Sequence, residues 1–208
     1  MSEKSASMPA RTSPPVRISY PQVFTPRAFK GSDPKYSVTL MFDKKNKEHV
    51  EFVKMIKADA EKALAEKWPD ASTRPRIPVV GDTRSLIKDG DKTRDTQGIP
   101  LKEKNPEYED HWTMRVASAN KPVVVDRNRQ EIINAGDIYG GCFCQVNVNV
   151  YTFNGETNKG VTAGLNGLLK YSDGESFGGG RPSVDVMFGE APPADGADPF
   201  AGNDDIPF

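Results

Sequence analysis

The stretch FCQVNVNVYTF, residues 143–153, alternates between two kinds of side chain and decides the class of fold. Its even-numbered positions carry small or branched side chains: Cys144, Val146, Val148, Val150 and Thr152. Its odd-numbered positions carry rings and amides: Phe143, Gln145, Asn147, Asn149, Tyr151 and Phe153. A period of two indicates a β-strand with one face in the core. We expect this strand to start at Asp137, with Gly140 and Gly141 forming a bulge that lets it bend.

The odd-numbered face of this strand combines aromatic planes with hydrogen-bonding amides. An ordinary solvated face carries Lys, Glu or Thr, whereas unpaired bases stack on rings while phosphates pass beside polar groups. We therefore interpret five of these positions as a surface for single-stranded nucleic acid: Phe143, Asn147, Asn149, Tyr151 and Phe153. The alternative is that Tyr151 and Phe153 pack under a helix or form an interface between copies of the chain.

The sequence on either side predicts further strands and one helix. Strands are predicted over Val16–Phe24, Lys35–Phe42, Trp112–Ser118 and Val161–Lys170, with a hairpin from Val123–Val125 to Ile132–Ile133. Pro21 places the first strand at an edge or a bulge, because proline cannot donate to a ladder. Asp43 can cap a helix that Pro69 ends. The apolar face of this helix is Phe52, Val53, Ile56, Ala60, Ala63 and Leu64.

The order of these elements predicts an all-β or α+β fold, an OB-like five-stranded β-barrel with one main lateral helix and long loops. Residues 70–110, rich in Pro, Gly and charged side chains, form a long loop insertion that is either a DNA-contacting arm or an exposed insertion. We assign residues 1–15 to a disordered N-terminal arm and residues 16–188 to the barrel domain. Residues 189–208 form a disordered acidic tail, because their composition cannot bury enough apolar surface.

Charge is divided unevenly along the chain. The 208 residues carry 28 Lys and Arg against 29 Asp and Glu, a net charge of -1. No base follows Arg181 and six of the acids lie beyond it, so the body carries +5 and the end -6. A basic body with an acidic end indicates a polyanion-binding surface and a separate interaction segment, or else a domain with a solvating tail.

Two groups of basic residues fit the polyanion interpretation. Strand parity turns Arg17, Lys35 and Arg115 outward, where they can follow a phosphate backbone. Loops supply the second group: Arg74, Arg76, Lys121, Arg127 and Arg129. Such loops flank the binding groove of OB-type domains, although charged loops also occur as simple solvated turns.

Several function classes find no support in the sequence. Cys142 and Cys144 lie two apart in an apolar run, which predicts buried thiols on one strand face, and the histidines lie too far off to complete a zinc site. We find no HExxH, GxSxG or P-loop motif and expect no enzyme, cofactor or metal. No run approaches the ~20 apolar residues of a membrane span. The Ser- and Pro-rich start lacks a signal-peptide core, which predicts a cytoplasmic location.

The last residues carry the most specific motif. They are Asp204, Asp205, Ile206, Pro207 and Phe208. This segment resembles the C-terminal peptide of bacterial single-stranded DNA-binding proteins, in which acidic residues precede a final Ile-Pro-Phe. Phe208 can bury its ring while its carboxylate meets a basic residue of a partner. The resemblance implies that the tail recruits replication or recombination proteins.

Short segments of the body carry a second resemblance that covers most of Val16–Asp185. They are KDGD at 88–91, PEY at 106–108, KP at 121–122, YGGC at 139–142, GV at 160–161, GLN at 164–166 and DG at 173–174. With them the chain is similar to a family of bacteriophage single-stranded DNA-binding proteins. The family implies an OB-fold, sequence-independent binding of single strands, and a role in phage replication or recombination in the cytoplasm of a bacterial host. It assigns no contact residues, so ours come from parity and charge.

The predicted function is therefore to protect single-stranded DNA and to recruit partners through the tail, with self-association or cooperative assembly on DNA left open. Two alternatives also stay open. A strand-annealing mediator of recombination would use the same surface to pair strands. A protein-interaction module would use the rings without binding DNA.

Overall fold

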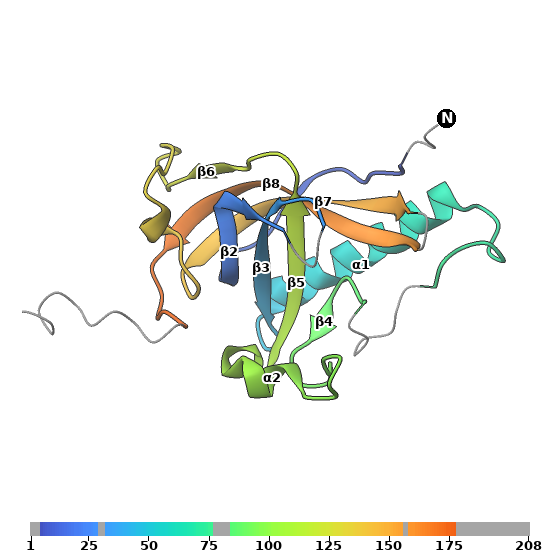
Figure 1. Ribbon diagram of the computed structural model, residues 1–208, viewed down its shortest axis with the longest axis horizontal. Coiled ribbons are helices and arrows are strands. Elements are labelled where there is room, and N and C mark those ends of the chain that lie inside the picture. The colour runs from blue at the N-terminus through green and yellow to red at the C-terminus, as the bar shows by residue number, and fades with distance from the viewer. Residues whose placement is uncertain (1–4, 29–31, 77–83, 156–157, 178–208) are drawn as a thin grey trace, which may run out of the picture. The chain divides into compact units, whose positions relative to one another are not determined.

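Eight β-strands and two α-helices make up most of the structure, a computed structural model that describes residues 5–28, 32–76, 84–155 and 158–177 (Figure 1). Five strands are long: β2 (Val16–Arg27), β3 (Lys35–Asp43), β5 (His111–Ser118), β7 (Phe143–Asn154) and β8 (Lys159–Ser172). Three are short: β1 (Arg11–Thr12), β4 (Lys88–Asp89) and β6 (Val123–Val125). The helices are α1 (Lys47–Lys67) and α2 (Leu101–Lys104), with 3-10 turns at Pro106–Tyr108 and Ala135–Asp137. The predicted α+β class, mostly sheet with one main helix, is confirmed.

Each long strand pairs with two of the others. β2 pairs antiparallel with β3 and β7, β3 pairs antiparallel with β5, and β7 pairs antiparallel with β8 along its whole length. The pairing of β5 with β8 is parallel and joins Ala117 to Gly164. The hydrogen-bonded order β7-β2-β3-β5-β8 therefore leads back to β7. The short strands extend this set, β1 at β7, β6 at β8 and β4 at β5.

The predicted alternation of β7 is confirmed. Its even-numbered side chains are buried, whereas the rings and amides at its odd-numbered positions are partly exposed. The strand starts at Phe143, not at the predicted Asp137, because the chain turns sharply before it. Gly141 has a φ of 115°, and a Cβ there would lie 1.9 Å from the carbonyl oxygen of Glu175. Gly141 therefore forms a turn that only glycine fits, rather than a bulge within the strand.

Strand β2 is irregular at Pro21, as predicted. Tyr20 has a φ of 48°, and the register with β3 shifts between Ser19 and Gln22. This bulge accommodates a residue that has no backbone N–H to donate to the ladder. Both sides of the bulge stay in the core, because residues 18 and 23 are buried.

Helix α1 packs against one side of the sheet, where it contacts β3, β7 and β8 (Figure 1). Its predicted apolar face is confirmed, and Phe52 stacks on Phe42 of β3 with ring centroids 5.6 Å apart. The cap differs from the prediction. Asn46, not Asp43, accepts hydrogen bonds from two amides of the first turn, because β3 runs on through Asp43. The helix ends before Pro69, as predicted.

Residues 5–13, predicted to belong to a disordered arm, lie along β7 instead. The backbone amides of Met8 and Ser13 donate to carbonyls of β7. Met8 is 5% exposed, and Arg11 forms an ion pair with Asp59 of α1. The arm finds partners because β2 pairs with β7 only through the first two residues of each strand, which leaves the rest of that edge of β7 available.

The predicted long loop of residues 70–110 is largely ordered where the structure describes it. β4 pairs with β5, and the chain then passes through α2 to reach β5. Lys44 holds this segment, since its Nζ lies 2.7 Å from Asp89 Oδ1 and 2.6 Å from Asp91 Oδ2. The hydrogen bond from the Lys44 ammonium lowers the pKa of Asp91 below its usual range. These carboxylates are thus neutralised by a lysine.

Two further predictions concern the cysteines and the hairpin. Cys142 and Cys144 are buried free thiols with their sulfur atoms 3.7 Å apart, as expected. The hairpin after β6 is also present, with the amide of Ile132 donating to the carbonyl of Val124 at 2.9 Å, and β6 lies parallel to β8. Within the described ranges, no helix has the length and apolar character needed to cross a membrane.

Candidate nucleic-acid interface

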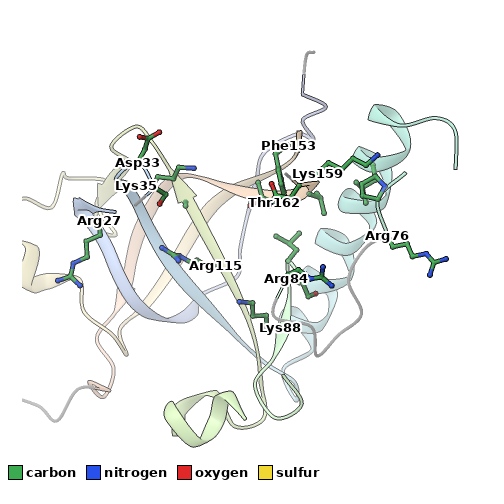
Figure 2. Close-up of a pocket in the computed structure, with 18 residues that line it drawn as sticks. Arg27, Asp33, Lys35, Arg76, Arg84, Lys88, Arg115, Phe153, Lys159 and Thr162 are labelled. Carbon is green, nitrogen blue, oxygen red and sulfur yellow. The ribbon is translucent and has the colours of Figure 1, made fainter. Parts of the chain in front are cut away.

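A groove of about 820 Å³ opens on the surface of the sheet (Figure 2). It is bounded by residues on both sides of the β2–β3 connection, by β5, by the end of β7 and the start of β8, and by residues 75–76 and 84–88. Its basic lining residues come from all of these segments: Arg27, Lys35, Arg76, Arg84, Lys88, Arg115 and Lys159. Among its described lining residues Asp33 alone is acidic. The groove therefore concentrates positive charge in one place.

Strand parity places two of these cations in the groove. Arg115 lies on the face of β5 opposite to the buried Met114. Its Nη2 donates to the hydroxyl of Ser37 on β3 at 3.2 Å, which orients the guanidinium over the outer face of the sheet. Lys35 begins β3 and is exposed. Figure 2 shows Arg115 between Lys35 and Lys88, so the cations follow one another across the strands.

Four of the groove cations lack an acidic partner. Among the residues that the structure describes, no carboxylate lies within 4.0 Å of a nitrogen of Arg27, Lys35, Arg76 or Arg115. Some lysines elsewhere are paired, as Lys44 is with two aspartates. Uncompensated charge gathered in one groove indicates a polyanionic ligand rather than a structural role.

Phe153 gives the groove an aromatic wall. Its half-buried ring lies beside Thr162 and Lys159 (Figure 2). The Nζ of Lys159 donates to the carbonyl of Thr73 at 2.7 Å and lies 5.7 Å from the ring centroid of Trp68, which ties the start of β8 to the chain after α1. A ring among cations is the combination that a single strand requires, because its bases stack while its phosphates need positive charge.

The other predicted residues of β7 lie farther along the same face. Tyr151 is the next outward ring on the strand and is half-buried. The side-chain amides of Asn149 and Asn147 donate to the hydroxyls of Ser7 and Thr12, at 3.1 and 2.9 Å. The N-terminal arm therefore engages the amide part of the predicted face and continues along the strand, where Ser7 lies opposite Tyr151. Of the two rings, Phe153 lines the groove.

Arg17 and Phe143, also predicted to bind a strand, belong to a separate cluster. Arg17 Nη2 donates to the carbonyl of Glu175 at 2.6 Å, and its Nε donates to that of Gly141 at 3.2 Å. The guanidinium carbon lies 4.2 Å from the ring centroid of Phe177 and 5.9 Å from that of Phe143. Arg17 thus fixes the last described residues against β2 instead of lining the groove.

The predicted loop cations divide between three places. Arg76 lines the groove, whereas Arg74 donates to two carbonyls at the end of α1. Three others lie around β6, outside the groove: Lys121 before the strand, and Arg127 and Arg129 in the hairpin after it. The guanidinium carbon of Arg127 lies 4.8 Å from the ring centroid of Tyr171 at the far end of β8. This hairpin is a second basic region, distinct from the groove.

The groove thus brings together four predicted residues: Lys35, Arg76, Arg115 and Phe153. It adds four cations that the sequence analysis did not select: Arg27, Arg84, Lys88 and Lys159. Position could have identified Arg27 and Lys159, because they end β2 and begin β8, and the connections at those strand ends flank OB-type grooves. Arg84 and Lys88 reach the groove only because the segment before β5 folds back onto that strand, which no local pattern indicates.

The predicted tail residues Asp204, Asp205, Ile206, Pro207 and Phe208 lie outside the described residues, as does all of 178–208. The predicted recruiting role of this segment therefore rests on its amino-acid sequence alone. In the part of the chain that is described, no three His, Cys, Asp or Glu side chains gather as ligands for a metal ion.

Known proteins match most of the chain. A family model described as "Enterobacter phage Enc34, ssDNA-binding protein" matches residues 10–197. The solved structure of the single-stranded DNA-binding protein from bacteriophage Enc34 in complex with ssDNA is 27% identical, with a TM-score of 0.67, and the match covers 81% of this chain and 89% of that one. "Putative protein p50" of Acyrthosiphon pisum secondary endosymbiont phage 1 is 27% identical over 175 residues, which cover 82% of this chain and 88% of the relative.

A more distant structure shares the fold. It is gp2.5, a single-stranded DNA binding protein encoded by bacteriophage T7, with 17% identity and a TM-score of 0.55. The match covers 90% of this chain and 97% of that one. At this identity the likeness shows a common fold alone.

Proposed function

The chain belongs to the family of the Enterobacter phage Enc34 single-stranded DNA-binding protein, and we propose that it binds single-stranded DNA without reading its sequence. The observation that carries this proposal is the groove, where Phe153 lies among cations, four of which have no carboxylate partner within the described part of the chain. A relative that is 27% identical was solved in complex with ssDNA, which supports the same ligand here.

We propose that the five long strands form an OB-type barrel. Their pairings lead from β7 through β2, β3, β5 and β8 back to β7. When only the long strands are counted, β2, β3, β5, β7 and β8 are the first to fifth strands in chain order. The β2–β3 and β7–β8 connections then correspond to the two loops that flank the binding face of OB-folds. Arg27 and Lys35 flank the first connection, and Lys159 follows the second. Arg115 lies on the binding face between them, which supports the assignment.

The proposed mechanism divides the strand between two kinds of contact. Phosphates bind the groove cations and release counterions, so affinity falls as salt rises. Bases stack on the ring of Phe153, and every base has a face that can do so, which makes binding tolerant of sequence. The role is protection of the strand and needs neither a cofactor nor a bond-breaking step.

The remaining predicted cations have secondary roles in this proposal. Lys121, Arg127 and Arg129 lie outside the groove and can contact the phosphates of a longer strand. Arg17 and Arg74 are structural, because backbone carbonyls and rings already engage their guanidinium groups.

We further propose that the acidic tail has two alternative partners. In the absence of DNA the tail occupies the basic groove, and so it competes with an incoming strand. When DNA binds, the tail is released to recruit replication or recombination proteins in the cytoplasm of a bacterial host. The division of charge into +5 for the body and -6 for the end supports the competition. The terminal Ile206, Pro207 and Phe208 support recruitment.

A titration of labelled oligothymidines of several lengths, at two salt concentrations, tests the proposal. We expect binding that weakens steeply with salt. Absence of binding at low salt would leave a protein-interaction module as the function, and metal-dependent turnover of the oligomer would indicate an enzyme. Faster pairing of complementary strands in the presence of the protein would add strand annealing, and the length series reports self-association on the strand.

A further inference from the structure

Two rings on the outward face of β7 extend over glycines of β8. Phe153 lies directly opposite Gly160, and a Cβ on that glycine would be 3.3 Å from both Cε1 and Cζ of the ring. A Cβ on Gly164 would lie 3.4 Å from Cε1 of Tyr151 and 2.6 Å from Oδ1 of Asn149. The ring of Phe153 therefore rests on Gly160, whereas a side chain at Gly164 would meet Asn149 first and would touch Tyr151 only at an ordinary contact distance.

This seating has a consequence for how the rings are presented. The backbone of β8 supports one side of the Phe153 ring, while the side chains of Phe153 and Tyr151 both stay only half-buried. Neither ring belongs to the core, because Val150 and Thr152 occupy the buried face of the same strand. Successive outward positions of a strand lie about 6.7 Å apart, so the rings form two neighbouring platforms.

The platforms adjoin the positive charge. Phe153 and Thr162 line the groove beside Lys159 (Figure 2), and Tyr151 lies opposite Thr162 in the ladder. Glycine within a strand weakens it and marks a place where a ligand or another backbone approaches closely. A purely structural account is also available, since a ring that covers a glycine stabilises a strand pair. The two accounts differ in what an unpaired base contributes to binding.

We infer that Gly160 is a positioning residue that seats Phe153 against β8 so that an unpaired base stacks on the outer side of its ring. This inference rests on the proposed function and names how the same site recognises bases. A methyl group on Gly160 comes too close to Cε1 and Cζ of the ring and tilts it away from the strand, while the groove cations keep their places. Binding then loses the contribution of the bases and retains that of the phosphates.

The test compares Gly160→Ala with Gly167→Ala. Gly167 is a matched control on the same strand, because its Cβ would be 3.2 Å from the carbonyl oxygen of Val123 and meets no ring. Each variant is titrated with oligothymidine and with an abasic oligomer of the same length. Complete loss of one base–ring stack weakens binding by about 5- to 150-fold. A ring that is only tilted should weaken binding by a factor near the lower bound. We expect about fivefold weaker binding of oligothymidine by Gly160→Ala, an unchanged affinity of this variant for the abasic oligomer, and no change with Gly167→Ala.

A double-mutant cycle with Phe153→Leu provides the second readout. Leucine keeps apolar volume but offers no plane, so Gly160→Ala should have no further effect on oligothymidine binding in that background. The inference is overturned if Gly160→Ala binds oligothymidine normally, or if its affinity falls by the same factor for both oligomers. A wild-type chain that binds neither oligomer would instead refute the proposed function, so the two failures are distinguishable.

Discussion

Arg115 shows how a single groove residue is available to a ligand. It lies on the exposed face of β5, its guanidinium donates to the hydroxyl of Ser37, and no described carboxylate is paired with it. A cation held in this way can exchange its water and counterions for a phosphate at little structural cost.

Replacing such a cation should change the salt dependence of binding. For Arg115→Gln and for Lys35→Gln we expect about fivefold weaker binding of oligothymidine at 0.1 M salt, and a slope of log affinity against log salt that is shallower by about 0.7. Fluorescence anisotropy at several salt concentrations measures both. Lys54→Gln is the control, because Lys54 is an exposed residue of α1 outside the groove. Equal slopes for the groove variants and the control would remove Arg115 and Lys35 from the interface.

Arg17 shows the limit of residue-scale prediction. Its outward direction followed from strand parity, but its neighbours are Glu175 and Phe177, which are more than 150 residues away in the sequence. Parity predicts the direction of a side chain and not what it meets there. The same parity was sufficient for Arg115 and Lys35, because nothing acidic folds over them in the described chain.

At the scale of elements, residues 5–13 of the N-terminal arm lie along the edge of β7 rather than forming a flexible end. Met8 is buried at the edge of β7, and Arg11 joins the arm to α1. The burial of one side chain and the ladder bonds around it are what order these residues.

We expect Met8→Ala to lower the free energy of unfolding by about 2 kcal/mol or more, as for a buried methionine. Met55→Ala is the matched control, because Met55 is 42% exposed on α1 and should change stability by less than about 0.5 kcal/mol. Urea denaturation followed by circular dichroism gives both values. Similar small losses for the two variants would show that the arm contributes little to the folded state.

The segment around β4 depends on carboxylates that are ionised. The Lys44 hydrogen bond lowers the pKa of Asp91 in the folded chain, so the group stabilises the fold above the unfolded pKa of about 4 and loses that contribution as pH falls through its folded pKa. Asp91→Asn should therefore be less stable than wild type at neutral pH, and the difference should shrink as the pH falls below about 4. Urea midpoints at several pH values measure it, with Glu51→Gln in an exposed helix pair as the control. A difference that is independent of pH would contradict this role of Asp91.

Elements with strong local patterns were predictable, and those ordered by distant contacts were not. The period of two in β7 and the apolar face of α1 indicate from the local sequence alone which side chains are buried, and both predictions were confirmed. The N-terminal arm and the segment at 84–110 have polar sequences without a period. Their order comes from Met8 on the edge of β7 and from Lys44 beside Asp89, pairs that are far apart in the sequence. The groove was only partly predicted for the same reason. Arg84 and Lys88 reach it because the segment at 84–110 is ordered by such distant contacts.

At the scale of the whole molecule, the opposite charges of body and end make the proposed competition testable. Deletion of residues 199–208 should tighten binding of oligothymidine several-fold at low salt, and the gain should fade as added salt screens the tail. The double substitution Asp204→Asn with Asp205→Asn should give part of the gain without shortening the chain. Unchanged affinity in both variants would refute the competition, while capture of a partner by Phe208 would remain to be measured separately.

The central claim is that a single strand lies in the groove between the β2–β3 and β7–β8 connections. The most direct measurement is photo-crosslinking of an oligothymidine that carries 5-iodouracil at successive positions, with the attached residues located by mass spectrometry. The account predicts crosslinks at Phe153 and Tyr151, lost when Lys35 and Arg115 are both replaced by glutamine. Crosslinks confined to Tyr171 and the hairpin after β6, unaffected by those replacements, would contradict it.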